Sequence, residues 1–411
     1  MDLGQGVPTE PSSSEDEAMP HAKGMSEALA EIARGANQRD LIDENPFDAM
    51  KLVREARLGA LRLSPAEGGM GMSIRQLFGT VIDIAEADPV VAHILRVHYW
   101  FAEERLRSND IAARSRWLAE IAAGKLFGNA LTELGGAAIG SLQFKTSIVA
   151  DRDGYRLNGT KFYCTGSLFS DYINVFAARG DNTIVSLVVP THAPGVEMVD
   201  DWDGMGARKT GSGTTNFKNV RVESRDILLE LDRDKPSPPT FEFAYLQLYL
   251  QAVMAGVMRS IVRDAITVLK TRDRSFSHAL APRPVDDPFL QEVVGELASA
   301  TFAAEATILI AAEALEDARA SVREGVPDPR LSQRASLCSA QAKVLVDRIA
   351  ARAADQLFDV GGASSASRKK NLDRHWRAIR TLTLHNPTIY KAHYIGRHLI
   401  HGEDFPTNAY F

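Results

Sequence analysis

Apolar residues recur three and four positions apart in the first part of the chain, which is the spacing of one face of an α-helix. The segments MSEALAEIARGANQRD and SIRQLFGTVIDIAEADPVVAHILRVHYWFAEERL both show this spacing. Pro89 interrupts the second segment, so the pattern predicts two helices or one kinked helix there. We therefore predict an N-terminal helical domain over residues 25–125.

The pattern changes to an alternation of apolar and polar residues at about Leu126. TSIVADRDGYRLNGTKFYCTG alternates and carries Asp153-Gly154 and Asn158-Gly159 at turn positions, which is typical of β-hairpins. YINVFAARGDNTIVSLVVP and TTNFKNVRVES continue the strand pattern. The alternation predicts a compact central β domain over residues 126–232.

Helical spacing returns after the proline-rich stretch DRDKPSPPT. Three long amphipathic blocks and a shorter final one follow it, joined by short connections, as in antiparallel helical bundles. We predict a C-terminal helical bundle over residues 240–411. The fold class is then α+β, with a cleft where the domains meet, a common place for a ligand.

Composition and charge exclude several classes of protein. The first residues, MDLGQGVPTEPSSSEDEAMP, are acidic and rich in Ser and Pro, which predicts a flexible tail over residues 1–24. A net charge of −6, with basic residues spread along the chain, makes nucleic acid an unlikely partner. The apolar segment TFAAEATILIAAEALE is interrupted by Glu305 and Glu313, so we expect no membrane span.

Only two cysteines, Cys164 and Cys338, are present, too few for a disulfide framework and without paired metal-ligand spacing. The cysteine usage indicates a reducing, cytoplasmic setting. No dinucleotide-binding G-x-G-x-x-G follows a strand, and the P-loop, H-E-x-x-H and G-x-S-x-G motifs are absent from the sequence. These absences disfavour Rossmann dehydrogenases, P-loop NTPases, zinc proteases of that type and α/β-hydrolases.

Five segments, in a fixed order, resemble the acyl-CoA dehydrogenase superfamily. They are LTELGG, NGTKFYCTG, GMGARKTGSGTTNFKNVRV, RDRSFS and QLFDVGGASS. Each is weakly specific alone, but the ordered set covers nearly the whole chain after the tail. The resemblance implies that superfamily's fold: an N-terminal helical domain, a central β-barrel or sandwich, and a C-terminal antiparallel four-helix bundle.

The sequence departs from the dehydrogenases near its C-terminus. LHNPT stands where the family has approximately Tyr-Glu-Gly-Thr, so His385 occupies the position of the catalytic glutamate. Together with TKFYCTG, GNALTE and DWDGMG, this histidine is similar to the superfamily's oxygen-activating branch. That branch includes dibenzothiophene monooxygenase, sulfur-acquisition enzymes and nitrososynthases.

The resemblance implies a two-component monooxygenase. A separate flavin reductase would supply reduced FMN, and O2 would add at C4a to give a hydroperoxide that oxygenates a small organosulfur, nitrogen or aromatic heterocyclic substrate. FMN is expected over FAD, and a homotetramer is expected because neighbouring subunits complete the family's flavin sites. Two alternatives remain: an acyl-CoA dehydrogenase with FAD and an atypical base, and a flavin-binding relative without catalysis.

The candidate catalytic residues are His385, Asn129 and one of the histidines His93 and His98. A neutral imidazole or amide suits oxygen chemistry better than a carboxylate, which would repel a developing peroxide anion. His93 and His98 are five positions apart and do not share a helix face well. We expect His98 to face the flavin and His93 to be structural; singly, each is as compatible with a structural role.

The candidate cofactor-binding residues come from the segments that resemble the family. Arg274 and Ser277 would hold the FMN phosphate, where a guanidinium gives a charge-assisted contact, although a surface ion pair is an equally good reading of Arg274. Strand alternation predicts that two of the residues of the flavin segment, Tyr163 and Thr165, share a face. The full set is Tyr163, Cys164, Thr165, Trp202, Arg274, Ser277, Gly361, Gly362 and Arg380.

Overall fold

The computed structural model describes the chain apart from residues 1–12, 136, 137, 139, 181, 236–239, 409 and 410. Residues 1–12 of the expected tail lie outside the described part, and helix α1 (Ser13–Ile42) begins within the remainder. Four further α-helices follow before the sheet: α2 (Phe47–Glu55), α3 (Ile74–Ala87), α4 (Pro89–Leu106) and α5 (Ile111–Ala122).

The structure has two helices at this point, as predicted: α3 ends at Ala87 and α4 begins at Pro89. The Asp88 side chain accepts a hydrogen bond from the backbone N–H of Val90 (2.9 Å) and caps α4, whose first residue is Pro89. Proline is suited to that position because the first N–H of a helix has no partner inside the helix. This start fixes the register of α4, which carries both His93 and His98.

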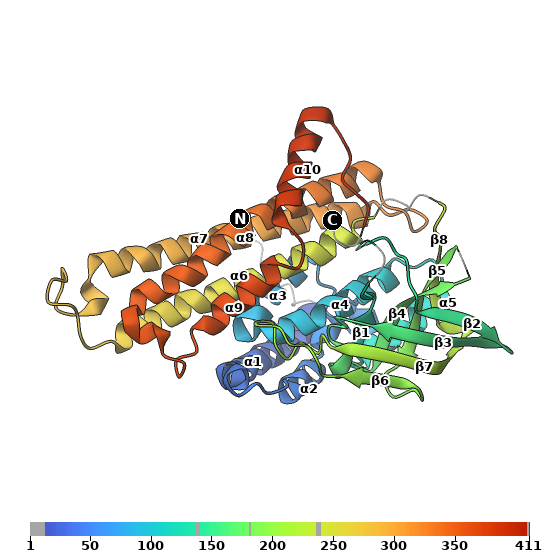
Figure 1. Cartoon of the computed structure of the whole chain (residues 1–411), viewed down its shortest axis with the longest axis horizontal. Coiled ribbons are helices and arrows are strands. Elements are labelled where there is room, and N and C mark those ends of the chain that lie inside the picture. Colours follow the sequence, from blue (N-terminus) through green and yellow to red (C-terminus); the bar gives the residue numbers. More distant parts are fainter. Residues whose placement is uncertain (1–12, 136–137, 139, 181, 236–239, 409–410) are drawn as a thin grey trace, which may run out of the picture.

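Eight strands form one sheet in the order β6-β7-β3-β2-β4-β5-β8, with β1 added beside β4 in a parallel pairing. The bounds are β1 (Phe127–Ala130), β2 (Ser147–Asp151), β3 (Gly154–Lys161), β4 (Tyr172–Arg179), β5 (Thr183–Pro190), β6 (Val196–Val199), β7 (Thr214–Glu223) and β8 (Ile227–Asp232). Figure 1 shows the sheet on one side of the molecule, with α4 running from it toward the helices.

One of the two predicted turns is a turn, and the other is not. β2 and β3 pair as a hairpin whose connection is Arg152-Asp153, next to the predicted Asp153-Gly154. Asn158-Gly159 instead lies inside β3, where the register against β7 shifts between Leu157 and Gly159. The Asn-Gly pair therefore marks a β-bulge here, because a bulge and a tight turn both use the backbone freedom of glycine.

Five helices complete the chain: α6 (Glu242–Thr271), α7 (Pro288–Ala320), α8 (Pro329–Gly361), α9 (Asp373–Thr383) and α10 (Thr388–His401). The three longest, α6, α7 and α8, pack on one another, and α3 lies against α6 and α7 (Figure 1). Buried side chains of α3, α4, α6, α7 and α8 form one continuous core. The N-terminal helices are thus joined to the C-terminal ones by shared packing.

Two C-terminal helices keep large apolar side chains exposed. α10 projects from the body in Figure 1, with Ile389 75% and Ile400 74% exposed. On α7, Phe302 is 75% exposed. α7 is also long and apolar enough to cross a membrane, by length and composition alone, with a mean hydropathy of 1.5 over its most apolar 18-residue window. The sequence analysis underestimated how apolar this helix is, although a single helix of this kind is weak evidence for a membrane span.

Candidate active site

The predicted flavin segment is a loop that leaves β3 and does not continue it. β3 ends at Lys161, and Tyr163 has a positive φ of 56°. The strand alternation that predicted a shared face for Tyr163 and Thr165 therefore does not apply. The Tyr163 ring is half exposed and meets the Trp202 ring edge to face, with 5.7 Å between the ring centroids. These two aromatic residues, both predicted cofactor contacts, lie together.

The other two residues of the loop point into the protein. The Thr165 hydroxyl is 2.8 Å from the Ser212 hydroxyl, which continues to Thr210 at 2.7 Å. Cys164 is buried, and burial raises the pKa of its thiol to about 11. A thiol with this pKa is neutral near pH 7, so Cys164 has the properties of a small buried residue and lacks those of a nucleophile.

His98 is held by two backbone hydrogen bonds, contrary to the expectation that it faces the flavin. Its Nε2 donates to the carbonyl of Gly59 (2.9 Å), and its Nδ1 accepts from the N–H of Phe127 (3.3 Å). Both ring nitrogens are occupied, one in tying α4 to β1 and the other in tying α4 to the turn at Gly59. The physical reason is the five-residue spacing on α4, which turns His98 toward β1 and His93 elsewhere.

His93 differs from His98 in that one of its ring nitrogens is left without a hydrogen bond to the described residues. It is buried, lines a cavity, and its Nδ1 has no hydrogen-bond partner among the described residues. Burial, followed by the positive charge of Arg96, lowers the pKa of His93 to about 3. The ring is therefore neutral near pH 7 and carries a buried polar atom that water or a bound molecule could satisfy.

His385 lies between α9 and α10, with its Nε2 3.5 Å from a terminal nitrogen of Arg96 on α4. Arg96 is buried and also donates from Nε to the carbonyl of Leu246 (3.0 Å). The protein packed around the His385 ring, then the charges of Arg96 and of His93 when protonated, lower the pKa of His385 well below its usual value. Because arginine only donates, Nε2 accepts and the neutral ring carries its proton on Nδ1.

Asn129 lies on β1, opposite Asn174 of β4 in the parallel pairing. Its side-chain oxygen is buried and has no hydrogen-bond partner among the described residues. Buried polar atoms are rarely left unpaired in folded proteins unless water or a ligand satisfies them. Asn129 and His93 each therefore present one buried polar atom that a bound molecule could satisfy.

Two glycine contacts show how these segments converge. A Cβ on Gly166, which has φ 78°, would lie 2.9 Å from the carbonyl oxygen of Ile94, so the flavin loop meets α4 next to His93. A Cβ on Gly206 would collide with the Arg377 carbonyl, so the loop that carries Trp202 lies against α9. The flavin loop thus lies against α4, and the Trp202 loop, which meets the flavin loop through Tyr163, lies against α9.

The predicted phosphate-binding residues lie elsewhere. Arg274 and Ser277 are exposed in the loop after α6, and Arg272 of the same loop donates to the Val360 carbonyl (3.1 Å), next to Gly361 and Gly362. The other end of α6 lies near His385, because Gln247 accepts from the side chain of Asn386 (2.5 Å). The intervening helix is roughly 36 Å long at 1.5 Å per residue. One FMN molecule cannot reach both sets within a single chain.

Arg380, the last of the predicted cofactor contacts, is exposed on α9 and donates to the Thr383 hydroxyl (3.3 Å). Arg377, one turn earlier, is half-buried and pairs with Asp40 of α1 at 2.8 Å. Of these two arginines, Arg377 lines a cavity between α1, α6 and α9.

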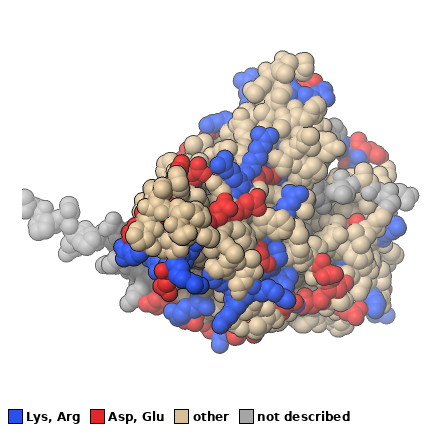
Figure 2. All heavy atoms as spheres, turned by 60° about the vertical axis from the view of Figure 1, so that its left-hand side comes forward, with Lys and Arg blue, Asp and Glu red and all other residues tan. Residues whose placement is uncertain are grey.

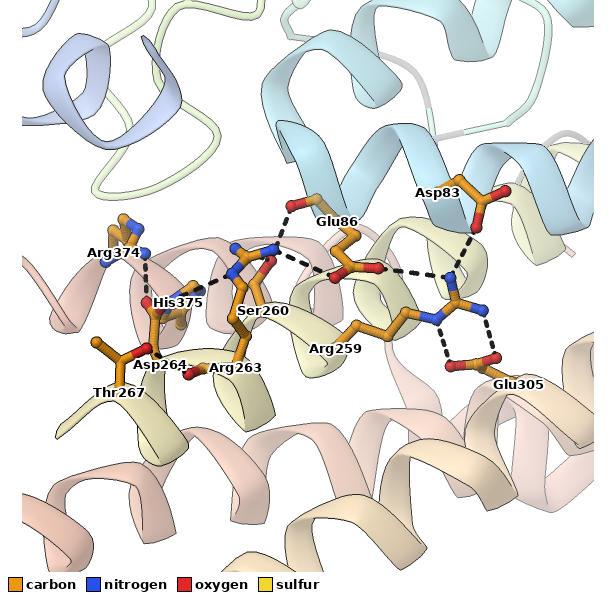
Figure 3. Close-up of polar contacts among 10 residues, drawn as sticks. All are labelled: Asp83, Glu86, Arg259, Ser260, Arg263, Asp264, Thr267, Glu305, Arg374 and His375. Carbon is orange, nitrogen blue, oxygen red and sulfur yellow. Dashed lines mark hydrogen bonds and ion pairs between the residues drawn. The ribbon is translucent and has the colours of Figure 1, made fainter. Parts of the chain in front are cut away.

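A cavity of about 650 Å³ opens between α1, α6 and α9. Its α6 wall carries the ion-pair network of Figure 3, in which Asp264 accepts from Arg374 (2.5 Å) and His375 (2.8 Å). These contacts lower the pKa of Asp264 to about 2, against the opposing effect of burial. The cavity reaches His93 at the junction of α3 and α4.

Sequence reasoning missed several residues of this region. Arg96 carries the clearest signal that could have found it, since it is a charged residue on a helix whose residues from Val91 to Arg105 are all buried, three positions after His93. Lys343, Asp347 and Lys391 were also missed. Lys343 pairs with Asp347 at 2.8 Å, and burial lowers the pKa of Lys391 to about 7. The Lys343–Asp347 pair has the i,i+4 spacing of an ion pair on one helix, which was the available signal, but the spacing does not show that the pair is buried. Lys391 comes from a different helix, α10, and no sequence pattern joins it to them.

Two family models match the chain: the acyl-CoA dehydrogenase middle domain over residues 128–220 and the acyl-CoA dehydrogenase C-terminal domain over residues 248–388. The chain belongs to the acyl-CoA dehydrogenase superfamily. The two matches cover most of the sheet, without β8, and most of α6 to α9, and His385 lies within the second match.

Several relatives of the chain are named as monooxygenases. "Probable FMNH2-dependent monooxygenase SfnC" of Pseudomonas putida is 28% identical over 90% of this chain and 92% of its own length. Dibenzothiophene monooxygenase of Rhodococcus qingshengii is 27% identical over 92% and 93%. The crystal structure of FMN-bound TdsC from Paenibacillus sp. A11-2 superposes with a TM-score of 0.87 and 25% identity, over 95% of this chain and all of that one.

Proposed function

We propose that this chain is the oxygenase component of a two-component flavin-dependent monooxygenase. It would take reduced FMN from a separate flavin reductase and use O2 to oxygenate a small organosulfur, nitrogen or aromatic heterocyclic substrate. The observation that carries the proposal is His385, a neutral imidazole beside Arg96 at the position of the dehydrogenases' catalytic carboxylate. The relatives named above, one of them bound to FMN, support the same activity.

The residues present fit a flavin ring. The Tyr163–Trp202 pair offers an aromatic surface that is partly exposed, and the approach of Gly166 to α4 leaves no side chain between the loop and the helix. Asn129 and His93 each hold one buried polar atom without a partner among the described residues. An amide oxygen and a neutral imidazole match the mixed donor and acceptor edge of an isoalloxazine.

Reduced FMN, when bound, supplies the two electrons that activate O2. The chain's own part is to shield that chemistry from water and to hold protons where oxygen atoms gain charge. His385 carries its proton on Nδ1 and lies beside the fixed charge of Arg96, which favours negative charge developing nearby. A glutamate at this position would add a negative charge and oppose that step.

We further propose a homotetramer that acts in the cytoplasm. Arg274, Ser277, Gly361 and Gly362 can contact a flavin only if it is bound at another copy's site. The exposed apolar side chains of α7 and α10 provide a surface for such copies. Within each copy, the packing of α6, α7 and α8 with α9 supports the expected four-helix bundle, and the long twisted path from β6 to β8 supports a barrel or sandwich.

The main experiment supplies the protein with FMN, a flavin reductase and NADH under O2, and compares product yield with hydrogen peroxide release. With indole or dibenzothiophene as the substrate, we expect oxygenated product and little peroxide. The dehydrogenase alternative predicts instead oxidation of an acyl-CoA with an artificial electron acceptor and FAD. Fast peroxide release with every substrate, together with acyl-CoA oxidation, would replace the proposal by that alternative.

Light scattering of the purified protein tests the assembly. We expect a mass of four chains, and a smaller species when Ile389→Glu and Ile400→Glu place charges on the exposed face of α10. The same substitutions should weaken FMN binding if the neighbouring copy completes the site. A monomeric wild-type protein that binds FMN tightly would contradict the assembly and leave the oxygenase activity to be judged separately.

A further inference from the structure

The cavity between α1, α6 and α9 has a charged outer part and an apolar inner part. Lys369 and Lys370 are exposed at its rim, whereas Val257 and Leu382 are buried along its wall. At its inner end is His93, whose Nδ1 has no hydrogen-bond partner among the described residues. The two ends therefore offer different chemistry to one elongated molecule.

The lining carries an excess of positive charge, with nine Lys or Arg residues and six Asp or Glu residues. The acidic residues are mostly neutralised within the fold: Asp40 pairs with Arg377, Asp88 with Arg39, and both Asp264 and Glu86 with arginines. Within the described residues, neither Lys369 nor Lys370 has a carboxylate at ion-pair distance, and Lys370 donates to the Ser364 hydroxyl (3.0 Å). The rim thus carries an excess of positive charge, whereas the charges of the cavity wall are paired with one another.

The wall is fixed before any ligand arrives. Figure 3 shows Asp264 meeting Arg374 and His375 from α9, while Arg263, its neighbour on α6, reaches Glu86 of α3 (3.2 Å). A network of this kind holds its dipoles and charges in place, so an anion entering the cavity would meet little rearrangement. In the space-filling view of Figure 2, Lys and Arg lie at the top, in the middle and in the lower part of the face shown, with Asp and Glu among them.

The inner end adjoins the proposed oxygenation site. His93 precedes Arg96 by three residues on α4, so the two side chains lie on the same helix face, and Arg96 contacts His385. The segment Gly206–Lys209 forms part of the cavity wall and follows Trp202, which meets the flavin loop. A ligand in the cavity would thus place one end near the oxygen chemistry.

We propose that this cavity binds the substrate and selects a small organic anion, with its reacting part at His93 and its carboxylate or sulfonate at Lys369 and Lys370. This inference rests on the proposed oxygenase function and narrows its substrates from small organosulfur, nitrogen and heterocyclic compounds in general to the acids among them. The lysine pair supplies the charge, and the ion-paired wall supplies the fixed path between the two ends.

The test compares two probes that differ by an acidic side chain: indole and indole-3-acetate. Their affinities for the flavin-free protein are measured by titration calorimetry at low and high salt. We expect indole-3-acetate to bind at least tenfold more tightly at low salt, with the advantage shrinking as salt rises. Equal affinities for the two probes would overturn the proposal.

The double variant Lys369→Gln, Lys370→Gln should lose the preference and retain the affinity for indole. The matched control Lys218→Gln, Lys235→Gln removes the same charge from two exposed lysines of the sheet region and should keep the preference. FMN affinity is measured on each variant. If the rim variant weakens FMN binding and keeps the probe preference, the rim holds the cofactor phosphate and the substrate proposal is wrong.

The two proposals fail in different ways. Binding of the probes requires neither flavin nor O2, so a preference for indole-3-acetate in a protein that never oxygenates anything would support the cavity assignment and refute the oxygenase function. Oxygenation of indole without any preference for the acid would refute the cavity assignment alone.

Discussion

Two histidines ten residues apart, His375 and His385, show how neighbours assign different roles to one side chain. Both are neutral near pH 7, because burial lowers the pKa of His375 to about 4 and surrounding protein lowers that of His385 well below its usual value. His375 donates to the Asp264 carboxylate at 2.8 Å, whereas His385 faces the Arg96 guanidinium at 3.5 Å. The first is an anchor between α9 and α6, whereas we propose that the second takes part in the oxygen chemistry.

The largest expected effect comes from removing the second histidine. His385→Ala should keep the fold and the FMN affinity but lower coupled product formation about 10²-fold or more, since positioned acid–base groups contribute that much. Oxygen uptake should continue as hydrogen peroxide release. The measurement is product and peroxide yield per NADH oxidised, with FMN affinity as the control. Unchanged product yield would remove His385 from the mechanism.

Removing the anchoring contact between Asp264 and His375 should lower the stability of the fold more than it lowers coupled product formation. Asp264→Asn leaves Arg374 and His375 without their carboxylate, and we expect a loss of about 2–3 kcal/mol in the free energy of unfolding, since breaking a buried pair is costly. Urea unfolding measures it. Because the network also lines the proposed substrate cavity, substrate affinity should weaken, but at saturating substrate the ratio of product to peroxide should change far less than in His385→Ala. A large loss of coupling with wild-type stability would mean that the network takes part in the reaction.

The predictability of these two sites differed for a physical reason. His385, Tyr163 and Trp202 could be predicted as site residues because the segments that contain them resemble family motifs, and their roles stay predictions. The anchor Asp264–His375 and the contact Arg96–His385 join residues more than 100 positions apart, and side-chain meetings of that kind leave no periodic signal in a sequence.

The fold followed the same rule. Apolar periodicity placed the helical and strand regions, and Pro89 located a true helix start. The turn predicted at Asn158-Gly159 was wrong because an Asn-Gly pair suits a tight turn and a β-bulge equally. The choice between His93 and His98 depended on which face of α4 meets β1, and Gly59 and Phe127 decided it through backbone hydrogen bonds that sequence does not reveal.

A smaller effect should follow from changing the neighbour of His385. Arg96→Met removes a positive charge that lowers the pKa of His385, so that pKa should rise. Because activity requires the neutral ring, activity in the variant should be lost at a higher pH as the solution is made acidic, by about one pH unit. Arg96→Lys keeps the charge and should leave this limit closer to that of the wild type. The pH profile of coupled product formation measures the shift.

If Arg96→Met loses activity at the same acidic pH as the wild type, burial alone sets the protonation of His385. Arg96 also donates to the Leu246 carbonyl, so the stability of both variants is measured alongside. A variant that loses activity equally at every pH has lost the position of His385, whereas a shifted limit with the same maximum reports its charge. The two readouts separate the two roles of Arg96.

The smallest effect is expected at Cys164, which belongs to the predicted flavin segment but has the environment of a core residue. Its thiol is buried, and burial raises its pKa to about 11, so it is neither charged nor accessible. Cys164→Ser should change coupled product yield less than about threefold, because a hydroxyl of similar size can occupy the space and find a partner in neighbouring Thr215. The native thiol should also resist iodoacetamide near pH 8 until the protein unfolds. Rapid alkylation with loss of coupling would show that the loop opens and that Cys164, like His385 and unlike His375, is directed at a ligand.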